Sequence, residues 1–147
     1  MWDDSAAAGF LPLLPDGHPL PEIESGLFAE LLANSELSVL VAEQNEEVVG
    51  YAGSGASRDS DTGPEVGEVR SLFVASGSWR SGVGGALMNA VLGDLRERGY
   101  SEAIVWSFAA NDRANAFYES CDFERDGAER TEERFADIPS VRYRRSL

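Results

Sequence analysis

Three glycines between a predicted strand and a predicted helix constrain this chain more than any other feature. The stretch SWRSGVGGALM, residues 78–88, places Gly82, Gly84 and Gly85 directly before a helical pattern of apolar residues. The first amides of a helix have no partner within it, and glycine lets a phosphate approach them closely. Glycine also lets a helix pack tightly against its neighbours. The stretch therefore predicts either a phosphate site or a close helix contact, and the glycines alone fit both equally.

Alternating side chains predict the strand that leads to these glycines. Residues 66–75, VGEVRSLFVA, have the period of two that is typical of a strand. The two faces of this strand are expected to carry Val69, Ser71 and Phe73 on one side, and Glu68, Arg70, Leu72 and Val74 on the other.

The remaining patterns predict one α/β domain over residues 1–147, because no repeat or linker divides the chain and its length suffices for one core. Apolar periods, capping residues and turn residues place the other elements. The predicted elements are a helix over 22–33, hairpin strands over 37–43 and 46–53, a mobile loop over 54–64, a helix over 82–98, a strand over 102–108, a helix capped by Asn111 that runs through Tyr118, and closing strands.

Residues that the sequence lacks exclude several classes of site. There is no lysine, so the Gly-Lys-Ser/Thr end of a nucleotide-hydrolysing P-loop is absent. Leu87 stands where a dinucleotide fingerprint needs its third glycine, although Glu102, 20 residues after Gly82, keeps a nicotinamide site open as an alternative. With one histidine, His18, and one cysteine, Cys121, neither serine hydrolase chemistry nor a Cys/His metal cluster is expected, and no metal is predicted.

The charge of the chain is strongly negative and unevenly distributed. The formal net charge is -14, with 14 acids and 2 arginines in residues 1–75 against 12 acids and 10 arginines in residues 76–147. Nucleic acid is therefore a poor partner, and an anionic ligand is expected on the C-terminal half. An acidic chain without lysine suits a high-salt cytoplasm or a GC-rich genome. No apolar run of about 18 residues and no leader pattern is present, so we expect no membrane span and a cytoplasmic protein.

Three segments together resemble a known family. EVRSLFVASGSWRSGVGGALM, GYSEAIVW and NDRANAFYESCDFERDG are similar to the acetyl-CoA binding core of the GNAT superfamily of N-acetyltransferases, over about residues 39–147. The resemblance implies a mixed, mostly antiparallel sheet flanked by helices on both faces. Two parallel central strands would splay apart to admit the pantetheine arm. Relative to the family, the chain begins inside the first helix, so the first strand is expected to be missing, and an exposed sheet edge would favour a homodimer.

The resemblance also implies a set of residues that bind acetyl-CoA. The family's Gln/Arg-x-x-Gly-x-Gly/Ala loop falls on residues 79–84, with Trp79 at its first position. Phe73 and Val74 would offer backbone hydrogen bonds to pantetheine. Asn111 would cap its helix and contact the cofactor, although capping alone explains it equally well. The backbone amides implied in pyrophosphate binding belong to Arg80, Ser81, Gly82, Val83, Gly84 and Gly85.

Two residues are candidates for the proton transfers of acetyl transfer. An amine with a reference pKa of about 10.4 must lose a proton to attack the thioester, so a general base is required. Glu68 occupies the strand position where many family members carry this base; the alternative is a surface carboxylate. Tyr118 matches the tyrosine that protonates the leaving thiolate; the alternative is a buried aromatic beside Phe117. Cys121 has no histidine near it in sequence, which disfavours an acetyl-enzyme.

These implications predict an enzyme that transfers the acetyl group of acetyl-CoA to a primary amine by direct attack in a ternary complex. The acceptor would be a small-molecule amine or a protein N-terminus, and the acidic N-terminal half favours a cationic one. The alternative is a non-catalytic acyl-CoA-binding sensor or dimerisation module. A nicotinamide-binding domain would leave the segment from Asn111 to Tyr118 unexplained.

Overall fold

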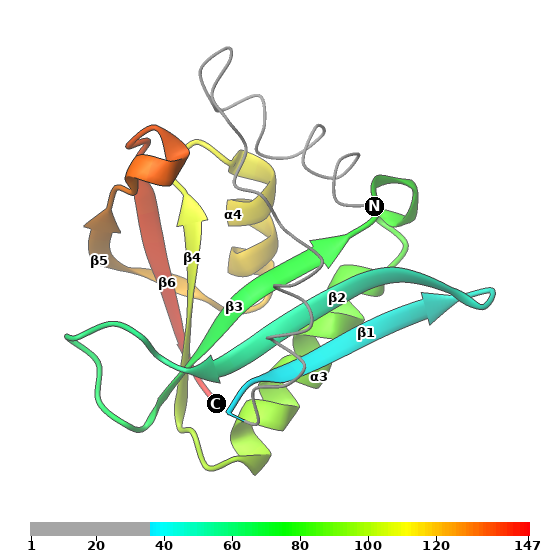
Figure 1. The fold of residues 1–147 in the computed structure, drawn as a ribbon, viewed down its shortest axis with the longest axis horizontal. Helices are drawn as coiled ribbons and strands as arrows, with labels where there is room; N and C mark the ends of the chain where they lie inside the picture. The colour runs from blue at the N-terminus through cyan, green and yellow to red at the C-terminus, as the bar shows by residue number, and fades with distance from the viewer. Residues whose placement is uncertain (1–35) are drawn as a thin grey trace.

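A computed structural model describes residues 36–147, which form one six-stranded sheet with two α-helices (Figure 1). The helix predicted over residues 22–33 and the question of a missing first strand lie outside these residues. The described elements are β1 (Ser38–Gln44), β2 (Glu47–Ala56), β3 (Val66–Val74), the 3-10 turn η2 (Ser76–Ser78), α3 (Val83–Glu97), β4 (Glu102–Phe108), α4 (Asp112–Ser120), β5 (Glu124–Arg130), η3 (Glu133–Phe135) and β6 (Ser140–Ser146).

The sheet is mixed and mostly antiparallel, as the resemblance implied. Its strand order is β1-β2-β3-β4-β6-β5, and β3 with β4 is the parallel pair among the described strands. This pairing runs from Val66 opposite Glu102 to Val69 opposite Val105 and ends there. Both strands continue beyond that point, so they diverge towards the end where β3 meets α3 (Figure 1). The predicted splay is therefore present.

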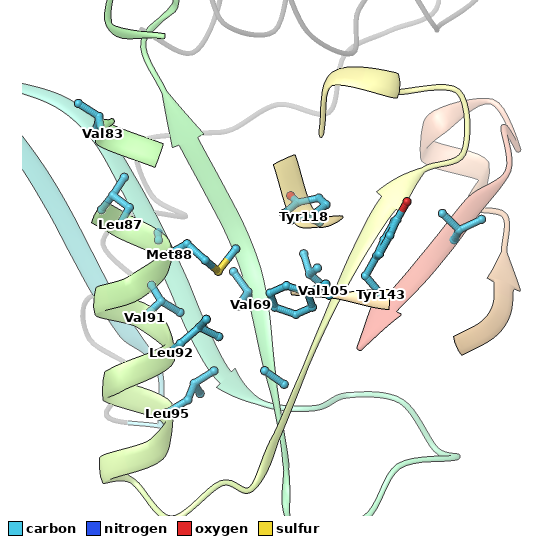
Figure 2. Packing of buried hydrophobic residues seen from close by; sticks show 14 residues of the cluster. Val69, Val83, Leu87, Met88, Val91, Leu92, Leu95, Val105, Tyr118 and Tyr143 are labelled. Atoms are coloured by element: carbon cyan, nitrogen blue, oxygen red, sulfur yellow. The ribbon is translucent and has the colours of Figure 1, made fainter. Parts of the chain in front are cut away.

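The hydrophobic core lies between the sheet and the two helices (Figure 2). Residues of α3 spaced by four, Val83, Leu87, Val91 and Leu95, are buried against Val69 and its neighbours on the sheet. Each such burial is worth about 1.5–3 kcal/mol, which is what fixes a helix of this composition to the sheet. Tyr118 of α4 belongs to the same cluster. The two described helices therefore cover the same face.

A β-bulge in β3 changes which side chains share a face. Ser54 of β2 pairs with Val69, whereas its neighbour Gly53 pairs with Ser71, so Arg70 is an extra residue on β3. Val69 belongs to the core under the helices, and Leu72 and Val74 pack against that same core. The predicted alternation, which placed Val69 opposite Leu72 and Val74, is wrong because it assumed an unbroken period of two. Glu68 and Phe73 consequently point to the other face.

The ends of the helices agree with the predicted caps. Gly82 precedes α3 with φ +88°, and Gly99 follows it with φ +94°, both in the left-handed region that favours glycine. The Asn111 side chain accepts a hydrogen bond from the Ala114 amide at 3.2 Å, which caps α4. Asp122, after α4, has φ +65°. This strained position leads to a prediction for stability.

Replacing Asp122 by glycine is expected to raise the free energy of unfolding by about 0.5 kcal/mol, because relief of left-handed strain exceeds the entropy that glycine adds to the unfolded chain. Its side chain is 88% exposed and only 4.0 Å from Arg145, so losing that pair costs little. Urea denaturation at constant m-value measures the change. The D122N variant keeps the Cβ atom and should gain less; a D122G protein less stable than wild type would contradict the argument.

The loop that joins β2 to β3 is anchored, whereas the sequence predicted a mobile loop. Arg142 of β6, whose side chain is 6% exposed, donates two hydrogen bonds to Asp61, at 2.7 and 2.8 Å, and one to Asp59 at 2.9 Å. These bonds, first those to Asp61, raise the pKa of Arg142. The Trp106 indole also donates to Asp59 at 2.9 Å. The polar loop, which has no apolar period, is thus held by the buried Arg142, a residue far along the chain.

Candidate active site

The divergent ends of β3 and β4 meet the first turn of α3 and one end of α4 (Figure 1). The sequence-predicted site residues lie on these four elements, on the loop between β3 and α3 or, for Asn111, at the N-cap of α4. Within residues 36–147, no group of three or more His, Cys, Asp or Glu side chains is arranged to hold a metal ion. No helix in that range is both long and apolar enough to cross a membrane.

The loop before α3 presents a run of unpaired backbone amides. Within residues 36–147, the amides from Arg80 to Gly85 donate no hydrogen bond, and the first one donated comes from Ala86 to the Gly82 carbonyl at 3.0 Å. The Ser81 hydroxyl donates to the Ser78 carbonyl, which holds the turn in place. Unpaired amides at a helix N-terminus favour an anion, since the helix dipole adds to them.

The glycines of this loop have different roles. A Cβ atom added at Gly82 or Gly85 would meet nothing within 4 Å, so open space adjoins the unpaired amides. A Cβ atom at Gly84 would lie 3.4 Å from the Phe117 ring of α4. Close packing therefore explains Gly84, whereas Gly82 and Gly85 leave room for a ligand. The loop fits a pyrophosphate group.

Trp79, where the family has Gln or Arg, links the loop to both neighbouring elements. Its indole nitrogen donates to the Val74 carbonyl at 2.7 Å. The guanidinium of Arg113, from α4, lies over its ring at 4.1 Å. Arg113 and the exposed Arg80 are thus two cations beside the unpaired amides. Sequence reasoning missed Arg113, although its place two residues after Asn111 could have indicated it.

Tyr118 lies between the divergent strands on the face that the helices cover (Figure 2). Its ring packs against those of Phe123 and Tyr143, with centroids 6.2 and 5.9 Å away. Burial, the largest cause, raises the pKa of Tyr118 to about 12. No residue in 36–147 forms a hydrogen bond with its hydroxyl. A hydroxyl that stays protonated at neutral pH is suited to donate a proton.

Two further polar side chains near the end of β4 were missed by sequence reasoning. Asn115 donates to the carbonyls of Phe108 and Ala109 at 3.3 and 3.0 Å, while its Oδ1 atom is buried without a hydrogen-bond partner. The Ser107 hydroxyl is also buried without a partner. Such orphaned atoms are uncommon in native interiors, and here they fit a ligand that carries amide groups. Asn115 lies at a buried position of α4 and Ser107 at a buried position of β4, where apolar residues are usual.

Glu68 is almost fully buried, at 2% exposure, so it is not the surface carboxylate that was its alternative interpretation. Its Oε1 atom accepts a hydrogen bond from Arg58 Nη2 at 2.9 Å, and its Oε2 atom accepts bonds from Arg58 Nε and N at 3.1 and 3.2 Å. Glu68 points to the face opposite Tyr118, because it alternates with its neighbour Val69, which lies in the core with Tyr118. The two candidate proton-transfer groups thus lie on opposite faces where β3 and β4 separate.

Cys121, at the end of α4, is half-buried, and its burial raises the pKa of the thiol. A raised pKa disfavours the thiolate that nucleophilic catalysis needs. Its backbone carbonyl accepts a hydrogen bond from Arg145 at 2.6 Å. That Cys121 forms no acetyl-enzyme stays a prediction.

Comparison with known proteins agrees with this geometry. The model of the acetyltransferase (GNAT) family matches residues 5–123. A Mycobacterium tuberculosis protein named as a probable N-acetyltransferase is 28% identical, over 98% of this chain and 81% of its own length. The solved ribosomal-protein-alanine N-acetyltransferase of Brucella melitensis is 26% identical with a TM-score of 0.76, over 99% of this chain and 91% of that one. An acetyltransferase of Bacillus subtilis solved in complex with CoA shares the fold, with a TM-score of 0.66 at 15% identity over 84% of each chain. The chain therefore belongs to the acetyltransferase (GNAT) family.

Proposed function

We propose that this protein is an N-acetyltransferase that moves the acetyl group of acetyl-CoA to a primary amine by direct attack in a ternary complex. The observation that carries the proposal is the run of unpaired amides from Arg80 to Gly85, which adjoins open space at the end of the splayed strands. Acetyl-CoA supplies an acetyl group that is activated as a thioester. The acceptor is a small molecule or a protein N-terminus.

In this proposal the loop and its surroundings bind the cofactor. The amides of residues 80–85 bind the pyrophosphate, and the guanidinium groups of Arg80 and Arg113 balance its charge. The backbone of Phe73 and Val74 binds the pantetheine arm. Asn111 and Asn115 face the same arm from α4, and the unpaired Oδ1 atom of Asn115 accepts one of its amide protons.

The two proton transfers fall to Glu68 and Tyr118. The amine nitrogen attacks the carbonyl carbon, a C–N bond forms, and the C–S bond breaks with its electron pair moving to sulfur. The amine proton passes to the Glu68 carboxylate, directly or through water, and the Tyr118 hydroxyl donates its proton to the thiolate. Exchange with solvent restores both groups. The raised pKa of Tyr118 keeps its proton in place at neutral pH, where it is available to the thiolate, and it also makes the hydroxyl a weaker acid.

A non-catalytic acyl-CoA-binding module is the second candidate. It is favoured by one contact, the clamp of Arg58 on both oxygens of Glu68, since a carboxylate held in this way is not available as a base. Turnover separates the two candidates, because a binding module releases no CoA when amines are supplied.

Calorimetric titration of the folded protein with acetyl-CoA tests the proposal. We expect a micromolar Kd, measured in molar KCl and again in dilute buffer because the chain is so acidic. Release of CoA in the presence of amines would then establish the enzyme. Absence of binding in both salts, from protein shown to be folded, would overturn the proposal and assign the glycines to packing alone.

A further inference from the structure

Two arginines flank Glu68, the one buried carboxylate among residues 36–147. The Arg58 guanidinium, with 54% of its side chain exposed, holds Glu68 through both oxygens. Arg70, the extra residue of the bulge, places its Nε atom 3.9 Å from Glu68 Oε2. The trio therefore carries a net positive charge, in a chain whose net charge is strongly negative.

Besides Glu68, two described carboxylates act on Arg58, those of Asp59 and Glu132, and each is paired with a further arginine. On the neighbouring loop, Asp59 and Asp61 are both paired with Arg142. Glu132, the residue before η3, is paired with Arg130 and Arg134. Within residues 36–147, the carboxylates that act on Arg58 are therefore balanced by other arginines.

Arg70 offers Glu68 an alternative partner. Its Nε atom is buried and has no hydrogen-bond partner, while its Nη2 atom donates to the Ala56 carbonyl at 2.8 Å. A buried guanidinium N–H without an acceptor is costly, so once Arg58 is engaged elsewhere a small shift of Glu68 towards Arg70 would satisfy both groups. Arg58 can leave Glu68 without releasing the loop, because Arg142 and Trp106 still hold Asp59.

We propose that Arg58 binds a carboxylate of the acceptor, so that the substrates of this enzyme are amines with a carboxylate a few bonds away, such as amino acids. This inference rests on the proposed function. When the acceptor carboxylate takes Arg58, Glu68 turns to Arg70 and one of its oxygens becomes available for the amine proton. The planar fork of arginine matches a carboxylate through two parallel hydrogen bonds, which a neutral acceptor cannot offer. Binding of the acceptor carboxylate thus frees Glu68 from Arg58, and Glu68 can then accept the proton of the acceptor amine.

Matched pairs of acceptors test the inference: free amino acids against the same amino acids as α-carboxamides, each with acetyl-CoA. The amine of a carboxamide loses its proton more easily, so intrinsic reactivity favours the carboxamide, and a preference for the acid reports recognition. For the wild type we expect kcat/KM to favour acids by about tenfold or more, the size typical of a charge-assisted hydrogen bond. In R58Q the preference should fall to about one, through a rise in the KM of the acid. The R96Q variant, which loses the same charge from an exposed position on α3, should keep the wild-type preference.

Three outcomes would overturn the inference while leaving the proposed function intact: wild-type enzyme that acetylates carboxamides or polyamines as well as acids, R58Q that keeps the preference, or R58Q that loses all acceptors equally. Inhibition of the wild type by N-acetyl amino acids against their amides gives the same comparison without a variant, so a misfolded R58Q does not remove the test. Failure to bind acetyl-CoA would instead overturn the proposed function itself.

Discussion

The G85E variant is expected to fold at least as well as wild type and to bind acetyl-CoA about 100-fold more weakly, or worse. Gly85 is the third residue of α3, where a carboxylate interacts favourably with the helix dipole by about 0.3–1 kcal/mol and where replacing glycine raises helix propensity. The added side chain would enter the open space beside the unpaired amides. The same carboxylate that stabilises the helix would therefore compete with the pyrophosphate for its amides.

Two control variants separate the local charge at residue 85 from the volume of the new side chain and from the net charge of the protein. G93E adds the same carboxylate to the same helix, at a position where a new Cβ atom also meets nothing within 4 Å, and should bind acetyl-CoA as wild type does. G85Q adds the same volume without the charge and should fall between the two. Calorimetric Kd values measure the affinity for acetyl-CoA, and thermal melting without ligand measures the stability of each variant. If G85E bound acetyl-CoA like G93E, the amides of residues 80–85 could not be its site.

Much of the fold could be predicted because its signals are local. The cap at Asn111, the glycine at 99 and the four-residue spacing along α3 each lie within a few residues of the structure that they determine. The order of strand, glycine loop and helix is local in the same way. Glu68 and Tyr118 were assigned through the resemblance, and their roles stay predictions.

What the sequence did not predict depends on residues far apart in the chain. The bulge at Arg70 arises from how β3 pairs with β2, and it cannot be inferred from the alternation of side chains within β3 alone. Asp61 and Arg142 are 81 residues apart, so their pairing could not be inferred from the loop composition. The clamp of Arg58 on Glu68 likewise joins the loop to the strand that follows it, across ten residues. The sequence thus indicated candidate site residues, but not their partners.

Replacing Tyr118 by phenylalanine is expected to lower kcat by about 100-fold to 1,000-fold while the KM for acetyl-CoA changes little, because the thiolate loses its proton donor. The ring and its packing against Phe123 and Tyr143 are kept. Y143F is the matched control. It removes a hydroxyl that bonds Glu119 and Arg125 in the same core, so it should lose stability and keep kcat. A Y118F enzyme within twofold of the wild-type kcat would assign protonation of the thiolate to water or to another group.

The raised pKa of Tyr118 gives the same variant a second, independent signature. A pKa of about 12 in the folded protein, against about 10 when unfolded, means that the folded state holds this proton more tightly. Its contribution to stability is therefore complete below about pH 10 and is lost as the pH rises towards 12, about 2–3 kcal/mol in all. Y118F lacks this loss, so its free energy of unfolding should fall less steeply over that range than that of wild type. For the same reason, kcat of the wild type should show no alkaline decline from Tyr118 below about pH 11. Equal slopes in the two proteins would mean that the hydroxyl is solvated, and a solvated hydroxyl would be a poorer match to a thiolate formed out of contact with water.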